Sequence, residues 1–312
     1  MTDSTLLRRR ESSSDLEISV PGSIANLGPG FDTLAVAVQL YLRLHVRADP
    51  GTNKLRFHFT RCKLDGENYI ERAFRFIARQ HGNSFPSLSV EVESDIPARA
   101  GLGSSAAATV AGLRLYEAMT SPLPRQELLK VAFALECHPD NVAAALLGGL
   151  TASCQLPDAS VVAVRMPWPE SLGFVVLTPE APLSTSASRN ALPENISRDD
   201  AVFNLQRLAL LLHTLQSGNF SFLREALRDR IHQPFRLSLV PGLEKALSLE
   251  HPDLLGVCLS GAGPSIVAFA EQNFEAIEEL LRKTFLPLGL TFTIRTIRAH
   301  LQTTETARDF PK

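Results

Sequence analysis

A long alternation of apolar and polar residues in the first quarter of the chain constrains the fold most strongly. Aliphatic side chains occupy every second position over residues 34–46: Leu34, Val36, Val38, Leu40, Leu42, Leu44 and Val46. From residue 39 onward the positions between them carry Gln39, Tyr41, Arg43, His45 and Arg47. Successive side chains of a strand point to opposite faces, so this pattern predicts one long, half-buried strand. Residues 55, 57 and 59 repeat the alternation and predict a partner strand.

The rest of the chain mixes strand and helix patterns without a regular βαβ repeat, which favours an α+β fold. Further strands are expected at residues 17–20, 88–93, 172–177, 255–260, 265–270 and 290–298. Helices are expected at residues 70–81, 106–119, 124–136, 201–215, 222–232 and 274–285. With 312 residues and 45% hydrophobic side chains, the chain can form two cored domains. We expect a disordered tail at 1–15, a first domain at 16–165 and a second at 166–312.

Charge and cysteine content exclude several classes of protein. The formal net charge is −2, which gives no electrostatic reason to expect nucleic acid or an anionic membrane as a partner. No apolar run approaches the roughly 18 to 20 residues that span a bilayer. The arginines at 8–10 precede no apolar segment, so a secretory signal is not expected, and acidic residues interrupt any transit-peptide pattern. The four cysteines and eight histidines form no zinc spacing. These features predict a cytoplasmic protein with free thiols.

The central functional signal is a glycine-serine loop at residues 97–107, which is followed directly by an alanine-rich helical run. Glycine lets the backbone approach a phosphate closely, and a helix N-terminus supplies free N–H groups and a positive dipole end. Serine hydroxyls can bind phosphate oxygens or Mg²⁺. The loop has neither the lysine of a Walker loop nor the spacing of a dinucleotide-binding loop. The alternative is a flexible turn before a structural helix.

Two further glycine loops accompany it. Residues 21–32 place Asn26 and Asp32 on a turn-rich segment just before the long strand, and residues 260–265 lie between two expected strands. For the last loop, a plain hairpin turn is the alternative.

In this order, the three loops resemble the three signature motifs of the GHMP kinases. Residues 26–32, Asn-Leu-Gly-Pro-Gly-Phe-Asp, are similar to the homoserine kinases within that superfamily. So are residues 136–143, residues 185–204 and residues 229–236. The resemblance extends from about residue 20 to the C-terminus. Cys137 departs from it, because the family usually has glycine between the glutamate and His-Pro-Asp-Asn.

The resemblance implies a two-domain GHMP kinase fold. Its N-terminal domain is expected to be like ribosomal protein S5 domain 2 and its C-terminal domain to be ferredoxin-like. ATP is expected as cosubstrate, with its phosphates on the central loop, and Mg²⁺ on Ser105 and Glu136. The implied nucleotide-binding residues are Asn68 (against adenine), Pro97, Arg99, Gly101, Leu102, Gly103, Ser104, Ser105, Ala106 and Ala107.

The acceptor that the resemblance implies is L-homoserine, phosphorylated to O-phospho-L-homoserine on the way to threonine. Arg189 and Arg236 match the arginines that hold its carboxylate, and Asp32 is the natural partner of its ammonium. Asn26, Asn141 and Thr185 are expected to complete the pocket. A surface salt bridge is the alternative for each arginine.

Glu136 and Asp140 are the expected catalytic residues. Asp140 matches the aspartate that mevalonate-type relatives use as a base. Its alternative is a carboxylate that orients neighbouring loops, with the proton passing directly to the phosphate. For the whole chain, the alternatives are a kinase for another small alcohol and an inactive nucleotide-dependent sensor. A homodimer is expected from the family.

Overall fold

The computed structural model describes residues 16–60, 66–136, 138–181 and 183–304. The first of its two sheets has strand order β3-β4-β2-β5-β6, with β1 paired to β2. Its strands are β1 (Leu16–Ala25), β2 (Leu34–Thr52), β3 (Leu55–Phe59), β4 (Pro86–Ser94), β5 (Leu150–Gln155) and β6 (Val161–Met166). The long strand predicted from the alternation is confirmed as β2, where Leu44 is buried and Arg47 is exposed.

The sheet order shows that the strand predicted to pair with β2 pairs elsewhere. Strand β3 exists, but it pairs in parallel with β4 and not with β2. The reason is that β2 already has an antiparallel neighbour on each side, with Leu44 opposite Ile18 of β1 and Val92 of β4. The outer edge of β4 is therefore where β3 can add.

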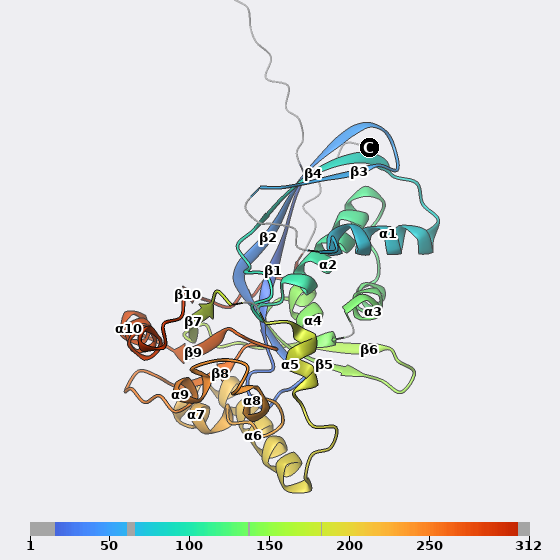
Figure 1. The fold of residues 1–312 in the computed structure, drawn as a ribbon. Coiled ribbons are helices and arrows are strands. Elements are labelled where there is room, and N and C mark those ends of the chain that lie inside the picture. Colours follow the sequence, from blue (N-terminus) through green and yellow to red (C-terminus); the bar gives the residue numbers. More distant parts are fainter. Residues whose placement is uncertain (1–15, 61–65, 137, 182, 305–312) are drawn as a thin grey trace, which may run out of the picture.

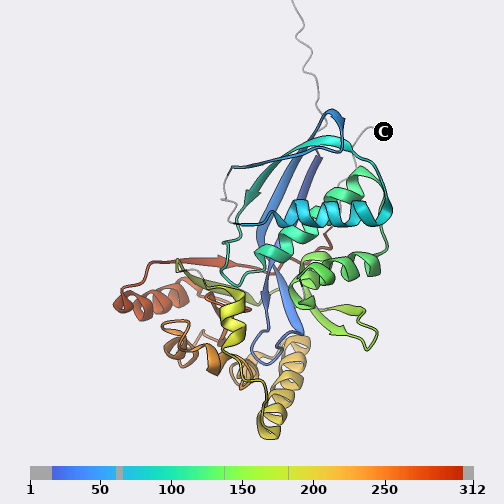
Figure 2. The same ribbon diagram turned by 45° about the vertical axis from the view of Figure 1, so that its right-hand side comes forward.

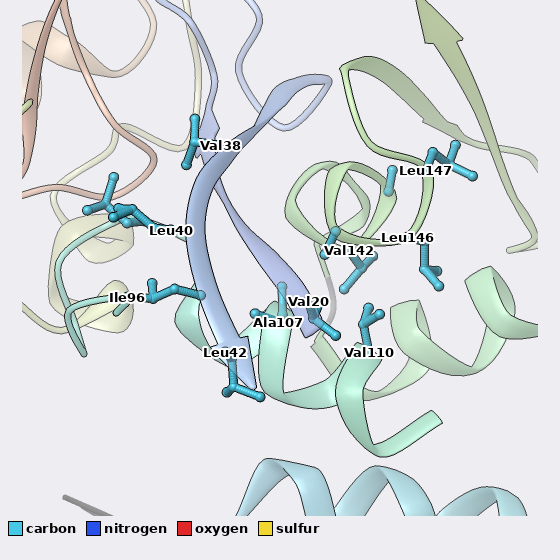
Figure 3. Packing of buried hydrophobic residues seen from close by; sticks show 14 of the residues in the cluster. Val20, Val38, Leu40, Leu42, Ile96, Ala107, Val110, Val142, Leu146 and Leu147 are labelled. Carbon is cyan, nitrogen blue, oxygen red and sulfur yellow. The ribbon is translucent and has the colours of Figure 1, made fainter. Parts of the chain in front are cut away.

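Four helices pack against this sheet (Figure 1): α1 (Tyr69–His81), α2 (Ser104–Met119), α3 (Arg125–Glu136) and α4 (Pro139–Leu147). Figure 3 shows the core between them, in which Val20 of β1 lies with Val110 of α2 and Val142 of α4, and all three are fully buried. Helix α1 ends at Gly82, which adopts the left-handed conformation expected of a C-terminal stop. The predictions of α1, α2 and α3 are confirmed, whereas α4 was not predicted.

The second sheet is antiparallel, in the order β10-β7-β9-β8. Its strands are β7 (Gly173–Pro179), β8 (Gly256–Leu259), β9 (Ile266–Ala270) and β10 (Phe292–Ile297). The helices of this half are α5 (Thr185–Asn190), α6 (Arg198–Ser217), α7 (Leu223–Ala226), α8 (Gln233–Arg236), α9 (Leu243–Leu247) and α10 (Phe274–Phe285). Two short 3₁₀ turns are η1 (Phe220–Phe222) and η2 (Leu286–Leu288). Figure 2 shows α6 and α10 extending from this half of the molecule.

The predicted helix at residues 222–232 is wrong. Helix α7 ends at Ala226, and α8 begins only at Gln233. Between them the carboxylate of Asp229 accepts the backbone N–H groups of Ile231, His232 and Gln233, at 3.0, 2.9 and 2.7 Å. An aspartate that caps the following turn competes with helical hydrogen bonding, so the chain turns there.

Residues 298–304 return to the first sheet. After β10, Ala299 forms a bridge with Val38, and the backbone N–H of His300 donates to Ala37 at 2.8 Å. Thr304 Oγ1 then donates to the carbonyl of Ala145 in α4 at 2.6 Å. The two halves are therefore tied together beyond their single connection after β6, and the division at residue 165 stays a prediction. Within the described ranges, no helix is both long and apolar enough to cross a membrane.

Candidate active site

The three glycine loops contact one another although they are far apart in the sequence. Asn26 Nδ2 donates to the carbonyl of Gly261 at 3.1 Å, and Ser260 Oγ donates to the carbonyl of Gly101 at 2.6 Å. The backbone N–H of Ser23 donates to Leu102 at 3.0 Å. The loops therefore form one structure at the junction of the two halves.

Two glycines of the central loop are required by this convergence. Gly101 has φ +75°, and a Cβ added to it would lie 2.3 Å from the carbonyl oxygen of Ser260. Gly103 has φ +72°, and its added Cβ would lie 2.2 Å from Ser23 Oγ. A side chain at either position would be both strained and obstructed.

The N-terminus of α2 is built to receive an anion. Gly103 is the N-cap, no side chain caps the helix, and its first turn carries no acidic residue. The first backbone bond of the helix runs from Ala107 N to Gly103 O, which leaves the N–H groups of the preceding residues available. Free N–H groups and the positive end of the helix dipole suit a phosphate here.

This helix end lines a cavity of about 650 Å³ to which both halves of the molecule contribute. The predicted residues that line it are Asn26, Asp32, Arg99, Gly101, Gly103, Ser104, Ser105, Ala106, Glu136, Asp140, Asn141, Thr185, Arg189 and Arg236. Pro97, Leu102 and Ala107 are not among the lining residues, and the last two are buried beneath the loop. Most of the predicted set therefore lies around one space.

Asn68 also lies outside the lining of this cavity. It is the N-cap of α1, where its Oδ1 accepts the N–H groups of Ile70 and Glu71 at 3.1 and 3.3 Å. It lines a smaller cavity of about 350 Å³, which shares Glu67 and Arg72 with the larger one. Its predicted contact with adenine stays a prediction.

Glu136 is a nearly buried carboxylate at the end of α3. Its Oε1 accepts from Thr109 Oγ1 at 2.7 Å and from Arg72 at 3.4 Å. Ser105 lies beside the same cavity, so a hydroxyl and a carboxylate are available as hard oxygen ligands. The described part of the chain contains no group of three or more His, Cys, Asp or Glu residues that could hold a metal ion. This donor set fits Mg²⁺ that is carried largely by phosphate oxygens.

Asp32, Arg189 and Arg236, which we call the charged cluster, line the same cavity as the central glycine loop. Both terminal nitrogens of Arg189 donate to the Asp32 carboxylate at 2.8 to 3.0 Å. Arg236 is 2% exposed, and burial followed by the charge of Arg189 lowers the pKa of its guanidinium to about 10. The ring of Phe31 lies under both guanidinium groups, at 5.4 and 5.6 Å. Arg236 is thus a buried cation at a cavity wall, which rules out a surface salt bridge as its role.

Asp140 lies in the first turn of α4 and is 2% exposed. Its Oδ1 accepts the backbone N–H of Asn141 at 2.7 Å and the side-chain amide at 3.1 Å. Burial raises the pKa of this carboxyl from 3.8 to about 6, and the negative charge of Asp32 adds to the rise. A buried carboxyl that titrates near neutrality, beside a cavity, is the kind of group that accepts or donates protons.

Sequence reasoning missed several polar residues that line the cavity, including Tyr69, Arg72 and His138. The guanidinium of Arg72 packs on the ring of Tyr69 at 4.5 Å and donates a hydrogen bond to Glu67 at 2.8 Å. Its position one turn after Asn68 on an amphipathic helix was a signal that could have drawn attention to it. His138 is the N-cap of α4, which Pro139 at the first helical position could have indicated. Cys137, the departure from the family pattern, lies outside the described residues.

Comparison with known proteins places this geometry in a family. Residues 68–149 match the model for the N-terminal domain of GHMP kinases, and residues 211–285 match the C-terminal model. A homoserine kinase of Solibacter usitatus is 39% identical over 280 residues, covering 88% of this chain and 91% of the relative. A homoserine kinase of Deinococcus radiodurans is 41% identical over 260 residues, covering 82% of this chain and 84% of the relative.

Solved structures of homoserine kinases have a similar fold. The homoserine kinase of Cytophaga hutchinsonii superposes with a TM-score of 0.81 at 24% identity, covering 97% of this chain and all of that one, which is a likeness of fold. A putative homoserine kinase of Listeria monocytogenes gives a TM-score of 0.73 at 26% identity, covering 94% of this chain and all of that one. The predicted α+β, two-domain GHMP kinase fold is confirmed. With these identities over most of its length, the chain belongs to the homoserine kinase family of the GHMP kinases.

Proposed function

We propose that this enzyme transfers the γ-phosphoryl group of ATP to the side-chain hydroxyl of L-homoserine, as its relatives' names indicate. The products are ADP and O-phospho-L-homoserine, a step toward threonine. One observation carries the assignment: a single cavity contains both an uncapped helix N-terminus and charges complementary to an amino-acid zwitterion.

The nucleotide's phosphates bind at the N-terminus of α2. Residues 103–106 line the cavity there, and their backbone N–H groups and the hydroxyls of Ser104 and Ser105 are the groups they offer to a phosphate. Phosphoryl transfer depends mainly on positioning and on neutralising charge, and fixed N–H groups supply both without reorganising. Gly101 lets the chain turn tightly enough to present them.

Mg²⁺ is held by Ser105 and Glu136. The ion supplies neutralisation of phosphate charge when it is bound. Thr109 and Arg72 both donate to Glu136 Oε1, so this carboxylate is fixed in orientation before any ligand arrives. Support for this role is the pairing of two oxygen ligands with a phosphate site, which is the arrangement Mg²⁺ uses in kinases.

The acceptor amino acid binds at the charged cluster. Its carboxylate pairs with Arg189 and Arg236, whose planar guanidinium groups suit a carboxylate, and its ammonium pairs with Asp32. Asn26, Asn141 and Thr185 complete the polar wall. Asp32 and Arg189 also pair with each other. A bound zwitterion would replace this one internal ion pair with two pairs to its own charged groups.

Asp140 is the group best placed to accept the hydroxyl proton. With a pKa of about 6, most of this carboxyl is ionised at neutral pH, and its basicity exceeds that of an ordinary aspartate. Its hydrogen bonds to Asn141 fix its orientation. Two further expectations are a homodimer, which rests on the family, and a cytoplasmic location, which rests on charge and cysteine content. Light scattering and cell fractionation test them.

A coupled assay of ADP release tests the proposed reaction. Mg²⁺-ATP is supplied with L-homoserine, L-serine, L-threonine, mevalonate or galactose, one at a time. Rapid turnover with homoserine alone is the expected result. Turnover with another alcohol would keep the phosphate site and overturn the acceptor assignment, whereas ATP binding without turnover would indicate a nucleotide sensor.

A further inference from the structure

One histidine beside the charged cluster has no part in the roles described so far. His232 immediately precedes α8, and its side chain is completely buried. A buried imidazole has two polar nitrogens that need partners, so its contacts define what it does.

Both ring nitrogens of His232 contact elements of the acceptor site. Nε2 lies 2.8 Å from the carbonyl oxygen of Gly28, in the loop that carries Asn26 and Asp32. Nδ1 lies 2.9 Å from a terminal nitrogen of Arg236. The ring also stacks on Phe31, with centroids 5.2 Å apart and an angle of 22° between the planes. His232 therefore joins the first glycine loop to the buried arginine.

These partners specify the protonation state of the ring. A guanidinium can only donate, so Nδ1 must be the unprotonated acceptor of the bond from Arg236. A carbonyl can only accept, so Nε2 must carry the hydrogen and donate it to Gly28. The network admits only the neutral Nε2–H tautomer.

The surroundings agree with a neutral ring. Burial is the largest influence and lowers the pKa of His232, and the positive charge of Arg236 also lowers it. The carboxylate of Asp229, 3.6 Å from Nε2, and the more distant Asp32 act in the opposite direction. The carboxylate of Asp229 meanwhile accepts the backbone N–H groups of residues 231–233.

We propose that His232 is a positioning residue for the acceptor amino acid. Its Nδ1 orients the guanidinium of Arg236 toward the acceptor's carboxylate, and its Nε2–H holds the loop of Asn26 and Asp32 against the cavity. Arg236 has two further acceptors, the carbonyls of Gly261 at 3.0 Å and Ser188 at 3.4 Å. The imidazole completes this set, so that the guanidinium is held from three segments. This inference rests on the proposed function, because it assigns Arg236 to the homoserine carboxylate.

Two conservative substitutions distinguish the hydrogen bond that His232 accepts from Arg236 from the one that it donates to Gly28. In His232→Asn, the amide oxygen takes the place of Nδ1 and keeps an acceptor for Arg236, but the side chain is too short to reach Gly28. In His232→Gln, the amide nitrogen takes the place of Nε2 and keeps the donor to Gly28, but the acceptor for Arg236 is lost. A histidine that only fills space would respond to both changes in the same way.

We expect His232→Gln to raise the KM for homoserine at least about tenfold, because a buried charged hydrogen bond is lost. The KM for ATP should stay within about twofold, since the phosphate loop is untouched. His232→Asn should keep the homoserine KM several times closer to the wild-type value. His300→Gln is a matched control, because that ring bonds Tyr41 at 3.2 Å and does not line the cavity.

NMR of the His232 ring tests the proposed hydrogen-bond network without a measurement of turnover. In ¹⁵N-histidine-labelled enzyme without substrate, the His232 resonances, assigned by their loss in His232→Asn, should show a proton on Nε2 and none on Nδ1. A proton on Nδ1, or equal changes in homoserine KM for the two variants, would overturn the proposal. If wild-type enzyme fails to phosphorylate homoserine, the proposed function fails, and the tautomer still shows whether the network exists.

Discussion

At the scale of single residues, Asp140 shows how the site sets the chemistry of one group. Its side chain is almost completely removed from water, which disfavours the charged form and raises the pKa of the carboxyl to about 6. The hydrogen bonds from Asn141 favour the ionised form and limit the rise. The protein therefore keeps an unusually basic aspartate at the cost of some stability.

That cost can be measured in Asp140→Asn. The folded-state pKa lies above the ordinary 3.8, so the folded protein binds the proton more tightly, and the free energy of unfolding falls as pH rises from 3.8 to 6. Above that range, the ionised Asp140 lowers the free energy of unfolding by about 3 kcal/mol. The neutral amide of Asp140→Asn avoids this loss and keeps an oxygen that can accept from Asn141. Thermal or urea unfolding should show the variant more stable at pH 8 by up to about 3 kcal/mol, and equal to wild type below about pH 3. Turnover should fall at least about a hundredfold.

The result for Asp140→Asn distinguishes the two roles considered for Asp140, a proton acceptor and a carboxylate that orients its loop. Higher stability with lost turnover agrees with a proton acceptor. Higher stability with full turnover would leave Asp140 as a carboxylate that orients its loop, and a variant less stable than wild type at high pH would contradict the raised pKa.

Arg189 is the other residue whose role is open to direct measurement. Arg189→Ala removes the charge that we propose as a partner of the acceptor's carboxylate, and it leaves Asp32 without its bidentate bond. We expect kcat/KM for homoserine to fall by at least about 2 kcal/mol in transition-state stabilisation. Arg189→Lys keeps the charge without the planar fork and should recover part of the loss. An unchanged kcat/KM in Arg189→Ala would remove this arginine from the acceptor site.

At the scale of elements, the approach of the third loop to the phosphate loop depends on Gly101. In Gly101→Ala the new methyl group meets the backbone of Ser260 in a left-handed conformation, so the two loops must separate. We expect the Kd for ATP, measured by calorimetry, to rise at least about tenfold. Gly82→Ala is the matched control, because Gly82 has φ +66° but open space around it, and it should cost only about 1 kcal/mol of stability. Equal ATP affinity in Gly101→Ala and wild type would contradict the close-approach argument.

The elements also show what the sequence could and could not predict. Strand β2 and helices α1, α2, α6 and α10 were predictable because their apolar periodicity or caps are local. The helix expected at residues 222–232 failed because Asp229 satisfies three backbone N–H groups that a helix would have used. The predicted pairing of β3 with β2 was wrong, and β3 pairs with β4, because alternation identifies a strand and not its neighbour.

At the scale of the whole molecule, residues 298–304 tie the two sheets together. Residues 298–304 leave β10 and run along β2 and α4, where Thr304 is buried. Gly148 and the carbonyl of Gln302 approach so closely that an added Cβ would lie 1.9 Å from that oxygen. This segment therefore stabilises the first sheet although it belongs to the far end of the sequence.

Truncation tests this tie. Ending the chain after Ile297 should lower the free energy of unfolding by at least about 2 kcal/mol, because several buried hydrogen bonds are lost together. A chain that ends after Thr304 keeps the tie and serves as the reference. Equal unfolding midpoints for the two truncated chains would show that the returning segment contributes no stability.

The site itself is a property of the whole molecule. Charge, spacing and turn chemistry could single out each glycine loop, but not their meeting, because the contacts of Asn26 and Gly101 with the third loop join residues far apart in the sequence. The family resemblance was the signal that grouped the three loops as motifs of one kinase fold. Neither the local sequence features nor the family resemblance identified His232, because its role depends on partners in the first loop and in α8.

The central claim is that one cavity places a phosphate site beside a site for a zwitterion. Its most direct test is kcat/KM for L-homoserine compared with 4-hydroxybutyrate, which lacks the ammonium group, and 3-aminopropan-1-ol, which lacks the carboxylate. We expect each analogue to lose at least about tenfold in kcat/KM, because Asp32 or the arginine pair is then left without its partner. Equal kcat/KM values for the three alcohols would contradict the account, because the charged cluster would then have no part in recognising the acceptor.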